Sequence, residues 1–489
     1  MIDISTDCIG LAVDYLNKKY NVKIGTEYYT DIRTWREWWE GYVDGVHSYY
    51  ELGVDKKKQK RELYRLGMAK RVCEDWAALL LNEKTVIALE HKASSEFLQG
   101  KDGTGGVFKD TNFWSEGNEL LERAFAFGTG AFVARAENAK VNGEGSIVPD
   151  KDCRVGIEYI DALSIIPLSV VKSRITECAF VSTFLQKGKK CCYIECHTKD
   201  KSGNYVIENK YFNIDGSELK ETDISGGVAS RIETGSNIPW FAIIYPNIAN
   251  NIRHNNGMGM SVYANAIDNL KSVDIAFNNF VRDFWLGGKK VFYNQDMLLT
   301  DENGNTITPD DMTQQLFRMV GDGTDFDAKA ATQEYNPALR VTENKEGLQA
   351  LLDYLSFKCG MGTHRYKFEA GGVKTATEYS GERQELVQHA NRHMIPLESA
   401  LQTLCRAILY IGKTFCNADC DFDTQITINF EDGFVIDEET RRERDRQDVR
   451  DGLMQAWEYR VKWYGEDEAT AKAAIADMKT QTENPFGFV

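Results

Sequence analysis

The chain has 489 residues, of which 42% are hydrophobic and 27% charged, and these proportions are ordinary for a folded protein. Its length exceeds what one hydrophobic core usually serves, so we expect several subdomains. The formal net charge of −16 and the pI of about 5.1 argue against a protein that binds nucleic acid over its whole surface, because such proteins are normally basic. The same charge is compatible with a protein that lets DNA pass without holding it.

Cysteine and histidine usage gives no metal-binding pattern. The 11 cysteines are scattered without the paired spacing of a zinc site, and reduced thiols in a cytoplasm are the simplest interpretation. His389 and His393 are four residues apart, but Ala390 stands where a zinc-protease motif has its Glu. We therefore expect no metal and no cofactor.

Targeting and membrane signals are also missing from the sequence. The first residues show no basic stretch followed by an apolar run, so we expect no signal peptide. No segment reaches the roughly 20 apolar residues that span a bilayer. We expect no membrane among the partners of this chain.

Hydrophobic spacing predicts the elements of the first half of the chain. Residues 1–45 are rich in Tyr and Trp and predict a helical lead-in. The basic run 56–61 predicts an exposed helix start, with a phosphate contact as the alternative, and apolar positions from Leu63 to Leu80 predict an amphipathic helix. A further helix is expected over about 112–127, followed by strands. The strands are expected at 131–134, 156–160, 179–185, 191–197, 205–212 and 240–245.

Two long helices flank a small insert in the middle of the chain. Ser261 is placed to cap the first helix, and each helix carries an apolar stripe. The stripe residues are Leu270, Phe277, Phe284, Leu348 and Leu352. The insert, 289–339, predicts a small α/β unit with strands at 291–293 and 317–320. Two helices that bracket such an insert predict an antiparallel stalk with a head at its end.

A long helix with a kink is expected after a Gly-rich loop. Thr375 and Glu378 have the spacing of a capping box and predict the start of the helix. Pro396 predicts the kink, since a Pro inside a helix removes a hydrogen bond and clashes with the preceding turn. The helix is polar before Pro396 and apolar at helical spacing after it. This pattern predicts an element that leaves a core and crosses an aqueous space.

The end of the chain has one more strand and a charged tail. Residues 424–430 alternate as a strand does, and we expect this strand to return to the β region that ends near 245. The tail from residue 437 is helical in pattern and strongly charged.

Three stretches carry a resemblance to a known family. They are residues 64–77 (YRLGMAKRVCEDWA), 259–268 (GMSVYANAID) and 374–378 (KTATE). None is a catalytic signature, but their order and spacing are specific as a set. With them the chain resembles the portal proteins of tailed bacteriophages, in the siphovirus-like branch.

The resemblance implies an α+β, multi-part portal fold. Its parts are a β-rich and helical wing, a two-helix stem, a small α/β clip, a tunnel loop, a long kinked helix and a helical crown. The implied boundaries are 1–256 for the helical lead-in and wing, 257–288 and 340–361 for the two stem helices, 289–339 for the clip, 362–374 for the tunnel loop, 375–417 for the long kinked helix, 418–436 for a strand returning to the wing, and 437–489 for the crown.

The resemblance further implies a structural protein and not an enzyme. Portal proteins form a ring, typically a dodecamer, at one capsid vertex, and double-stranded DNA is packaged and later ejected through this channel. The implied partners are other copies of the chain, the DNA, the large subunit of terminase, the major capsid and scaffolding proteins, and a head-completion or adaptor protein. The implied location is the virion, after assembly in the host cytoplasm.

Basic residues at two places are candidates for contact with DNA. The tunnel loop contributes His364, Arg365, Lys367 and Lys374, and the junction of stem and clip contributes Lys289 and Lys290. An acidic wall with a few basic rings would guide a duplex without arresting it, because each Lys or Arg that neutralises a phosphate adds affinity. Each of these residues also has the plainer interpretation of a surface charge.

Two other functions stay open on the sequence. Residues 407–414 end in Gly412, Lys413 and Thr414 and match a loose phosphate-loop pattern, which would fit a packaging ATPase, although bulky residues at helical spacing precede them. Another capsid-associated structural protein, such as a connector or shell subunit, is the second alternative. An ATP-binding assay separates the first, and the number of subunits in the assembly separates the second.

Overall fold

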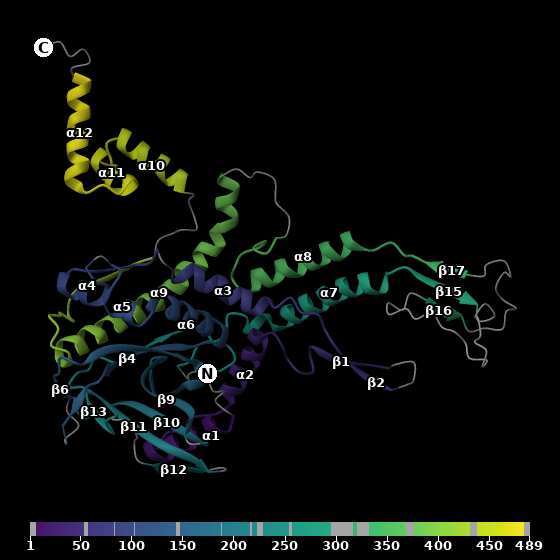
Figure 1. Cartoon of the computed structure of the whole chain (residues 1–489), viewed down its shortest axis with the longest axis horizontal. Helices are drawn as coiled ribbons and strands as arrows, with labels where there is room; N and C mark the ends of the chain where they lie inside the picture. Colours follow the sequence, from purple (N-terminus) through teal and green to yellow (C-terminus); the bar gives the residue numbers. More distant parts are fainter. Residues whose placement is uncertain are drawn as a thin grey trace, which may run out of the picture.

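The computed structural model is an α+β fold, as the sequence predicts (Figure 1). A body of helices and small sheets lies on one side, and a pair of helices extends from it with a small sheet at the far end. The structure describes residues 6–52, 57–82, 84–101, 103–142, 147–186, 188–215, 218–222, 228–253, 257–294, 316–319, 332–367, 376–430 and 438–483.

Helices occur along the whole chain. They are α1 (Thr6–Tyr20), α2 (Glu27–Glu40), α3 (Met68–Leu80), α4 (Lys92–Gln99), α5 (Gly106–Asp110), α6 (Phe113–Phe127), α7 (Ile267–Leu286), α8 (Val341–Lys358), α9 (Ala376–Phe415), α10 (Glu438–Arg450), α11 (Ala456–Tyr464) and α12 (Glu468–Glu483), with short 3-10 turns at Ala162–Ser164 and Ala264–Ala266. The helices predicted at 1–45 and 112–127 are confirmed.

The strands form several small sheets. The largest has the order β12-β11-β10-β9-β8, with β13 paired to β11. Its strands are β8 (Ile165–Val171), β9 (Arg174–Gln186), β10 (Lys189–Lys199), β11 (Tyr205–Asp215), β12 (Glu218–Thr222) and β13 (Arg231–Glu233). A second sheet has the order β14-β4-β7, with β4 (Gly130–Glu137), β7 (Arg154–Asp161) and β14 (Phe241–Ile244). The strands predicted between 131 and 245 are therefore confirmed.

The remaining strands pair locally or at a distance. β5 (Lys140–Val141) pairs with β6 (Ile147–Val148), and β18 (Ile426–Asn429) pairs antiparallel with β3 (Val86–Leu89). The strand predicted at 424–430 is thus present, but the prediction of its partner is wrong. The alternation of apolar and polar residues specifies which side chains face the core. It does not specify the strand with which the backbone pairs, so the sequence left the partner of this strand undetermined.

The basic run 56–61 does not start a helix. β1 (Ser48–Leu52) and β2 (Lys58–Glu62) form an antiparallel hairpin in which β2 is exposed along its whole length. The helix prediction is wrong here because an exposed Lys-rich run has only a weak backbone preference, and pairing with β1 decides its conformation. The amphipathic helix begins later, at Met68, and Leu63 and Leu66 lie outside it.

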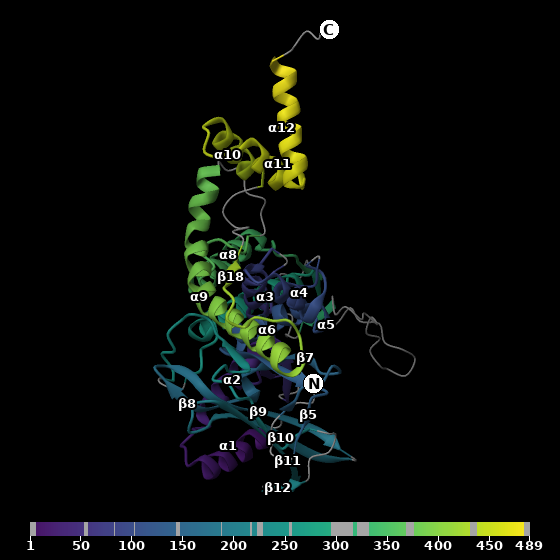
Figure 2. The same cartoon turned by 90° about the vertical axis from the view of Figure 1, so that its left-hand side faces the viewer.

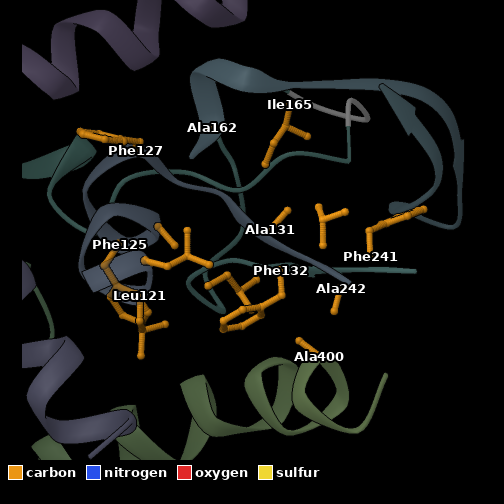
Figure 3. Packing of buried hydrophobic residues seen from close by; sticks show 14 of the residues in the cluster. Leu121, Phe125, Phe127, Ala131, Phe132, Ala162, Ile165, Phe241, Ala242 and Ala400 are labelled. Atoms are coloured by element: carbon orange, nitrogen blue, oxygen red, sulfur yellow. The ribbon is translucent and has the colours of Figure 1, made fainter. Parts of the chain in front are cut away.

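The centre of the core lies between the β14-β4-β7 sheet and two helices. Both α6 and α9 pack on this sheet. Figure 3 shows Leu121 and Phe125 from α6, Phe132 from β4, Ala242 from β14 and Ala400 from α9 gathered there, and all of them are buried. β4 is the middle strand, so it is covered by neighbours and helices, which explains why residues 130–134 are all buried.

A buried ion pair joins the two main sheets. The Arg135 guanidinium on β4 donates to the Glu195 carboxylate on β10 at 2.5 Å, and His197 lies 2.7 Å from the other carboxylate oxygen. Burial raises the pKa of Glu195, but Arg135 and the His197 hydrogen bond outweigh it and lower that pKa to about 2. The carboxylate therefore stays charged and holds the sheets in one relative position.

Two glycines cross where α6 ends and the segment before α7 passes. Gly128 has a φ of +85°, and a Cβ on Gly259 would lie 2.1 Å from the Gly128 carbonyl oxygen. The Gly259 N–H donates to the Thr129 hydroxyl at 2.9 Å. Only two backbones without side chains can come this close. This crossing fixes the place from which α7 leaves the body.

Ser261 does not cap the first long helix. α7 starts at Ile267 after a 3-10 turn, and the Ser261 hydroxyl instead accepts from the Tyr263 N–H at 3.4 Å. The prediction is wrong because residues 261–264 are buried in the body. Their backbone follows the core and not a helix, as the hydrogen bond from the Val262 N–H to the Phe125 carbonyl shows.

α7 and α8 lie side by side and carry a three-stranded sheet at their outer end, which confirms the predicted stalk and head (Figure 1). The sheet has the order β16-β15-β17, with β15 (Lys290–Asn294), β16 (Leu316–Met319) and β17 (Thr332–Tyr335). α9 is a bent helix of 40 residues that runs along the body, and α10 to α12 lie beyond its upper end (Figures 1 and 2).

The glycine crossing gives the first prediction. We expect Gly259→Ala to lower the free energy of unfolding by about 2 kcal/mol or more, because the new Cβ meets backbone that cannot move aside. The matched control is Gly347→Ala in α8, where a Cβ meets nothing and helix propensity should raise stability by about 0.5–1 kcal/mol. Urea unfolding measures both. Equal effects of the two changes would contradict the crossing.

Candidate functional site

The stalk is anchored in the body through a buried carboxylate on α7. Asp274 accepts from the Leu66 N–H at 2.8 Å and from His47 Nε2 at 3.1 Å. His47 Nδ1 accepts a hydrogen bond from the Val43 N–H. The ring proton is therefore on Nε2, which donates the hydrogen bond to Asp274. Burial raises the pKa of Asp274, and the bonds from Leu66 and His47 oppose that rise. Asn278, one turn further along α7, accepts from the Tyr64 N–H at 3.2 Å.

The outer end of the stalk is closed by a second polar cluster. Arg340 forms a bidentate pair with Asp283, with distances of 2.6 and 3.1 Å, and Asn344 donates to the same carboxylate at 2.7 Å. Because Asp283 lies near the end of α7 and the other two lie at the start of α8, this cluster fixes how the helices align. The hydrogen bonds from Arg340 and Asn344 lower the pKa of Asp283.

Lys289 and Lys290 lie where α7 passes into β15. Lys289 Nζ pairs with Glu334 at 2.6 Å, and both side chains are exposed. Lys290 Nζ donates to the Leu286 carbonyl at 2.6 Å and lies 5.7 Å from the centre of the Tyr335 ring. Both lysines therefore have partners within the chain at this junction.

Burial of the stalk residues changes along its length. Leu270, Leu348 and Leu352 are buried, and Phe277 is half-buried against the same core. Phe284 differs, because 48% of it is exposed, and the next residue, Trp285, is 77% exposed. The further exposed apolar residues on and beside the two helices are Ile275, Leu286, Leu339, Val341, Tyr354 and Phe357. Exposed apolar side chains thus occur at both ends of the stalk: Leu286, Leu339 and Val341 lie with Phe284 and Trp285 at its outer end, and Tyr354 and Phe357 lie close to the body.

The segment after α8 is tied to the body at its first residues. Trp76 on α3 donates from its indole N–H to the Cys359 carbonyl at 3.2 Å. Ser356 donates to the Gly362 carbonyl at 2.6 Å, and Gln349 donates to the Tyr366 carbonyl at 2.9 Å. Of residues 362–374, which the resemblance implies as the tunnel loop, the structure describes 362–367, and these are hydrogen-bonded to α8.

The basic residues of this segment have acidic neighbours. His364 Nδ1 lies 2.7 Å from Asp353 on α8, and Arg365 Nε lies 3.8 Å from Asp75 on α3. Asp75 also pairs with Arg71 at 2.8 Å. Lys367 is exposed. Lys374 and Thr375 lie outside the described residues, and of Glu378 the structure describes only its place in α9.

The bend of α9 is supported by a contact that the sequence did not reveal. Pro396 has no N–H, so the Arg392 carbonyl one turn earlier loses its helical partner. Asn247, from the loop after β14, replaces that partner, because its side-chain amide donates to the Arg392 carbonyl at 2.7 Å. The Asn247 backbone N–H also donates to His393 Nδ1 at 2.9 Å. The kink and the loop are thus held together by two hydrogen bonds.

His393 connects this kink to the centre of the body. Its ring packs edge-on against Trp76, at 4.8 Å between ring centres, and against Phe125, at 5.0 Å. Trp76 also holds the end of α8 through Cys359, so one aromatic cluster joins α3, α6, α8 and α9. Burial lowers the pKa of His393 to about 3, with smaller contributions from His389 and Arg392. The imidazole is therefore neutral at neutral pH.

The alternatives from the sequence find little support in this geometry. Gly412, Lys413 and Thr414 lie inside α9, and a Cβ on Gly412 would meet the Phe97 ring, so the residues form no open loop around a phosphate. Within the described ranges, no group of three or more His, Cys, Asp or Glu side chains is placed to hold a metal ion. In that same part of the chain, no helix is both long and apolar enough to cross a membrane.

Comparison with protein families decides the relationship. The family model described as "Phage portal protein, SPP1 Gp6-like" matches residues 16–453. The chain belongs to this phage portal protein family. The match covers the body, the stalk, α9 and α10, and ends before α11. No curated protein sequence matches the chain. Membership in a portal family agrees with the resemblance carried by residues 64–77, 259–268 and 374–378.

Several residues that position these elements have no signal in a single sequence. Asp274 and Asn278 are four residues apart on α7, so the sequence shows a polar pair within the apolar stripe. The sequence does not show that their partners lie among residues 43–66. Asn247 stands in a loop far from Pro396 in the sequence. The general rule that a mid-helix Pro orphans the carbonyl four residues earlier does identify Arg392 as the group needing a donor.

The buried neutral His393 gives the second prediction. Its pKa is near 6.5 when unfolded and about 3 when folded, so the unfolded chain takes up a proton first as pH falls. The stabilisation is complete above about pH 6.5 and decreases by about 1.4 kcal/mol per unit down to about pH 3. Urea unfolding at pH 7 and pH 5 should show a loss of about 2 kcal/mol that His393→Gln reduces.

The control for this prediction is His364→Gln, which changes an exposed histidine on the segment after α8. A loss of the same part of the pH dependence in this variant would show that the effect is not specific to His393. An identical pH dependence in wild type and His393→Gln would show that His393 does not provide the effect.

Proposed function

We propose that this portal-family chain assembles into a ring whose channel carries double-stranded DNA into and out of a capsid at one vertex. In this proposal α7 and α8 are the stem, the β16-β15-β17 unit is the clip, residues 362–374 are the tunnel loop, and α10 to α12 are the crown. The observation that supports it best is the set of exposed aromatic and aliphatic side chains on the outer part of the stalk.

Two antiparallel helices bury only the faces that they turn toward each other. Full burial of one large apolar side chain is worth about 1.5–3 kcal/mol, so leaving Phe284 and Trp285 in water is a substantial loss for a lone subunit. A neighbour placed by rotation about an axis would cover them with a different face of its own stalk. Such head-to-tail contacts close into a ring when the rotation that relates neighbouring subunits is a whole-number fraction of a full turn. A dodecamer is the assembly that the family resemblance favours.

The charge of the chain suits transport of DNA better than retention. A net charge of −16 per subunit repels phosphate over most of the surface. The candidate basic residues are placed as exceptions, at the stem–clip junction and in the tunnel loop. His364, Arg365 and Lys289 each have a carboxylate within the chain, which weakens their attraction for phosphate without removing the charge.

The remaining assignments follow from a portal function. The ring would sit among major capsid and scaffolding proteins, receive the large subunit of terminase during packaging, and later bind a head-completion or adaptor protein. The clip lies at the outer end of α7 and α8, and the crown lies beyond the upper end of α9 (Figure 1). We assign these two surfaces to the partners. Assembly would take place in the host cytoplasm, and the finished ring would be part of the virion.

The stem contacts give the third prediction. We expect the double change Phe284→Ser and Trp285→Ser to prevent ring formation while the subunit stays folded, because both side chains are exposed in the single chain. Mass photometry gives the size of the assembly, and circular dichroism with thermal melting tests the fold. Leu352 is a poor choice for this test, since it is fully buried and its loss would unfold the subunit.

The matched control for the stem is Leu185→Ser, which removes an apolar side chain whose exposure lies between those of Phe284 and Trp285, at the end of β9 in the body. It should assemble as the wild type does. Normal rings formed by the Phe284 and Trp285 variant would exclude these side chains from the contact between subunits.

The tunnel loop gives the fourth prediction. We expect Arg365→Ala with Lys367→Ala to leave ring assembly intact and to reduce the amount of DNA packaged or retained, because two positive charges facing the duplex are lost. Packaged DNA per particle is the measurement. Asp75→Asn is the control, since it removes the partner of Arg365 and keeps both positive charges. Normal packaging by the double variant, or equal defects in the double variant and the control, would reject a direct role for these charges.

A further inference from the structure

Two thiols from distant parts of the chain meet at the end of α9. Cys153 directly precedes β7, and Cys416 directly follows α9. Their sulfur atoms are 3.0 Å apart, and both cysteines are free thiols. The backbone holds the two segments together independently of the sulfurs, because the Asp150 N–H donates to the Phe415 carbonyl at 3.0 Å. The pair is therefore built into the packing of α9 against the body.

A cavity gives small molecules access to this pair. It has a volume of about 660 Å³, and Cys153 and Cys416 both line it. Cys416 is half-buried and Cys153 is buried, so an entering reagent meets Cys416 first. Three acidic residues, Glu96, Asp110 and Glu137, line the cavity together with one basic residue, Arg154.

We propose that Cys153 and Cys416 form a redox-active dithiol site that is oxidised to a disulfide by a small, positively charged disulfide entering the cavity. The distance between the sulfur atoms supports the bond, and the cavity supports access to it. The acidic lining supports the choice of a cationic oxidant, because it raises the local concentration of cations and lowers that of anions. This inference goes beyond the proposed function and does not depend on it.

The reaction is thiol–disulfide exchange in two steps. The Cys416 thiolate attacks one sulfur of the small disulfide, forms a mixed disulfide and expels the first small thiolate. Cys153, after losing its proton, attacks Sγ of Cys416, forms the Cys153–Cys416 bond and expels the second small thiolate. The two protons from the protein thiols end on the two released small thiols. The protein is oxidised by two electrons and the small disulfide is reduced by the same two.

The rate of this exchange should depend on pH. Burial raises the pKa of both thiols, and for Cys416 the contact with Cys153 raises it further. Only the thiolate reacts, so at neutral pH the rate should rise about tenfold per pH unit. The site is therefore slow to oxidise in a reducing cytoplasm and oxidises when disulfides are abundant.

Oxidation would tie the C-terminal end of α9 to the β14-β4-β7 sheet. The new bond would close a loop between residues 263 positions apart. A crosslink over such a long stretch restricts the unfolded chain and raises the melting temperature. If the proposed function holds, a ring assembled in a reducing cytoplasm would acquire this bond outside the cell, where disulfides persist.

Cystamine, a small cationic disulfide, is the probe for the test. The reduced, full-length chain is incubated with it at pH 8, free thiols are alkylated, and peptides are analysed by mass spectrometry without reduction. We expect a 153–416 crosslink as the main product, faster formation with cystamine than with anionic glutathione disulfide, and a higher melting temperature by about 2 °C or more. A chain that stays fully reduced, or a crosslink between other cysteines, would overturn the proposal.

Serine variants separate the two steps. Cys153→Ser should trap a mixed disulfide on Cys416 and show no rise in melting temperature. Cys420→Ser is the matched control, because Cys420 is a nearby buried thiol that the mechanism does not use, and it should leave the crosslink unchanged. A crosslink lost in Cys420→Ser, or equal rates with cystamine and glutathione disulfide, would contradict the assigned site and its oxidant.

Discussion

An antiparallel helix pair cannot cover its own surface, and the arrangement of this protein follows from that constraint. α7 and α8 bury one face against each other, and only the inner end of the pair has further cover from the body. The outer end keeps Phe284 and Trp285 in water. Assembly with other subunits would cover these side chains, and membership in a portal family implies a homo-oligomeric ring.

The body supplies a rigid base for this incomplete element. The crossing of Gly128 and Gly259 sets where α7 leaves, and Asp274 binds its first turns through Leu66 and His47. Trp76 joins the end of α8 to His393 on α9. Because α9 is bent at a Pro whose orphaned carbonyl is satisfied by Asn247, the long helix and the stalk share one support. The cluster of Trp76, Phe125 and His393 is therefore the contact that connects the end of α8 to α9.

The sequence predicts elements well where one periodicity extends over many residues. The strands of 131–245, the two stalk helices and the long helix were all visible, since apolar spacing reports local geometry directly. Prediction from the sequence was wrong where contacts with distant parts of the chain determine which of several local conformations a segment adopts. Residues 58–61 of the basic run lie in a strand because β1 pairs with them, and Ser261 lies in the core and not at a helix terminus.

The candidate site was predictable in composition and less so in geometry. Arg365 and His364 were recognised as loop charges, but their pairing with Asp75 and Asp353 depends on how α3 and α8 pack around the segment. The approach of Cys153 to Cys416 joins positions 263 residues apart, and no spacing rule reaches that far. Pro396 is the intermediate case: the sequence identifies the kink and the orphaned carbonyl, and only the fold identifies Asn247 as the donor.

The most direct measurement is an electron cryo-microscopy reconstruction of the purified full-length chain. We expect a closed ring with a central opening, in which the outer halves of α7 and α8 from adjacent copies contact each other and cover Trp285. A chain that remains monomeric at every concentration, or an assembly in which Trp285 stays in solvent and the stalks face outward, would contradict it.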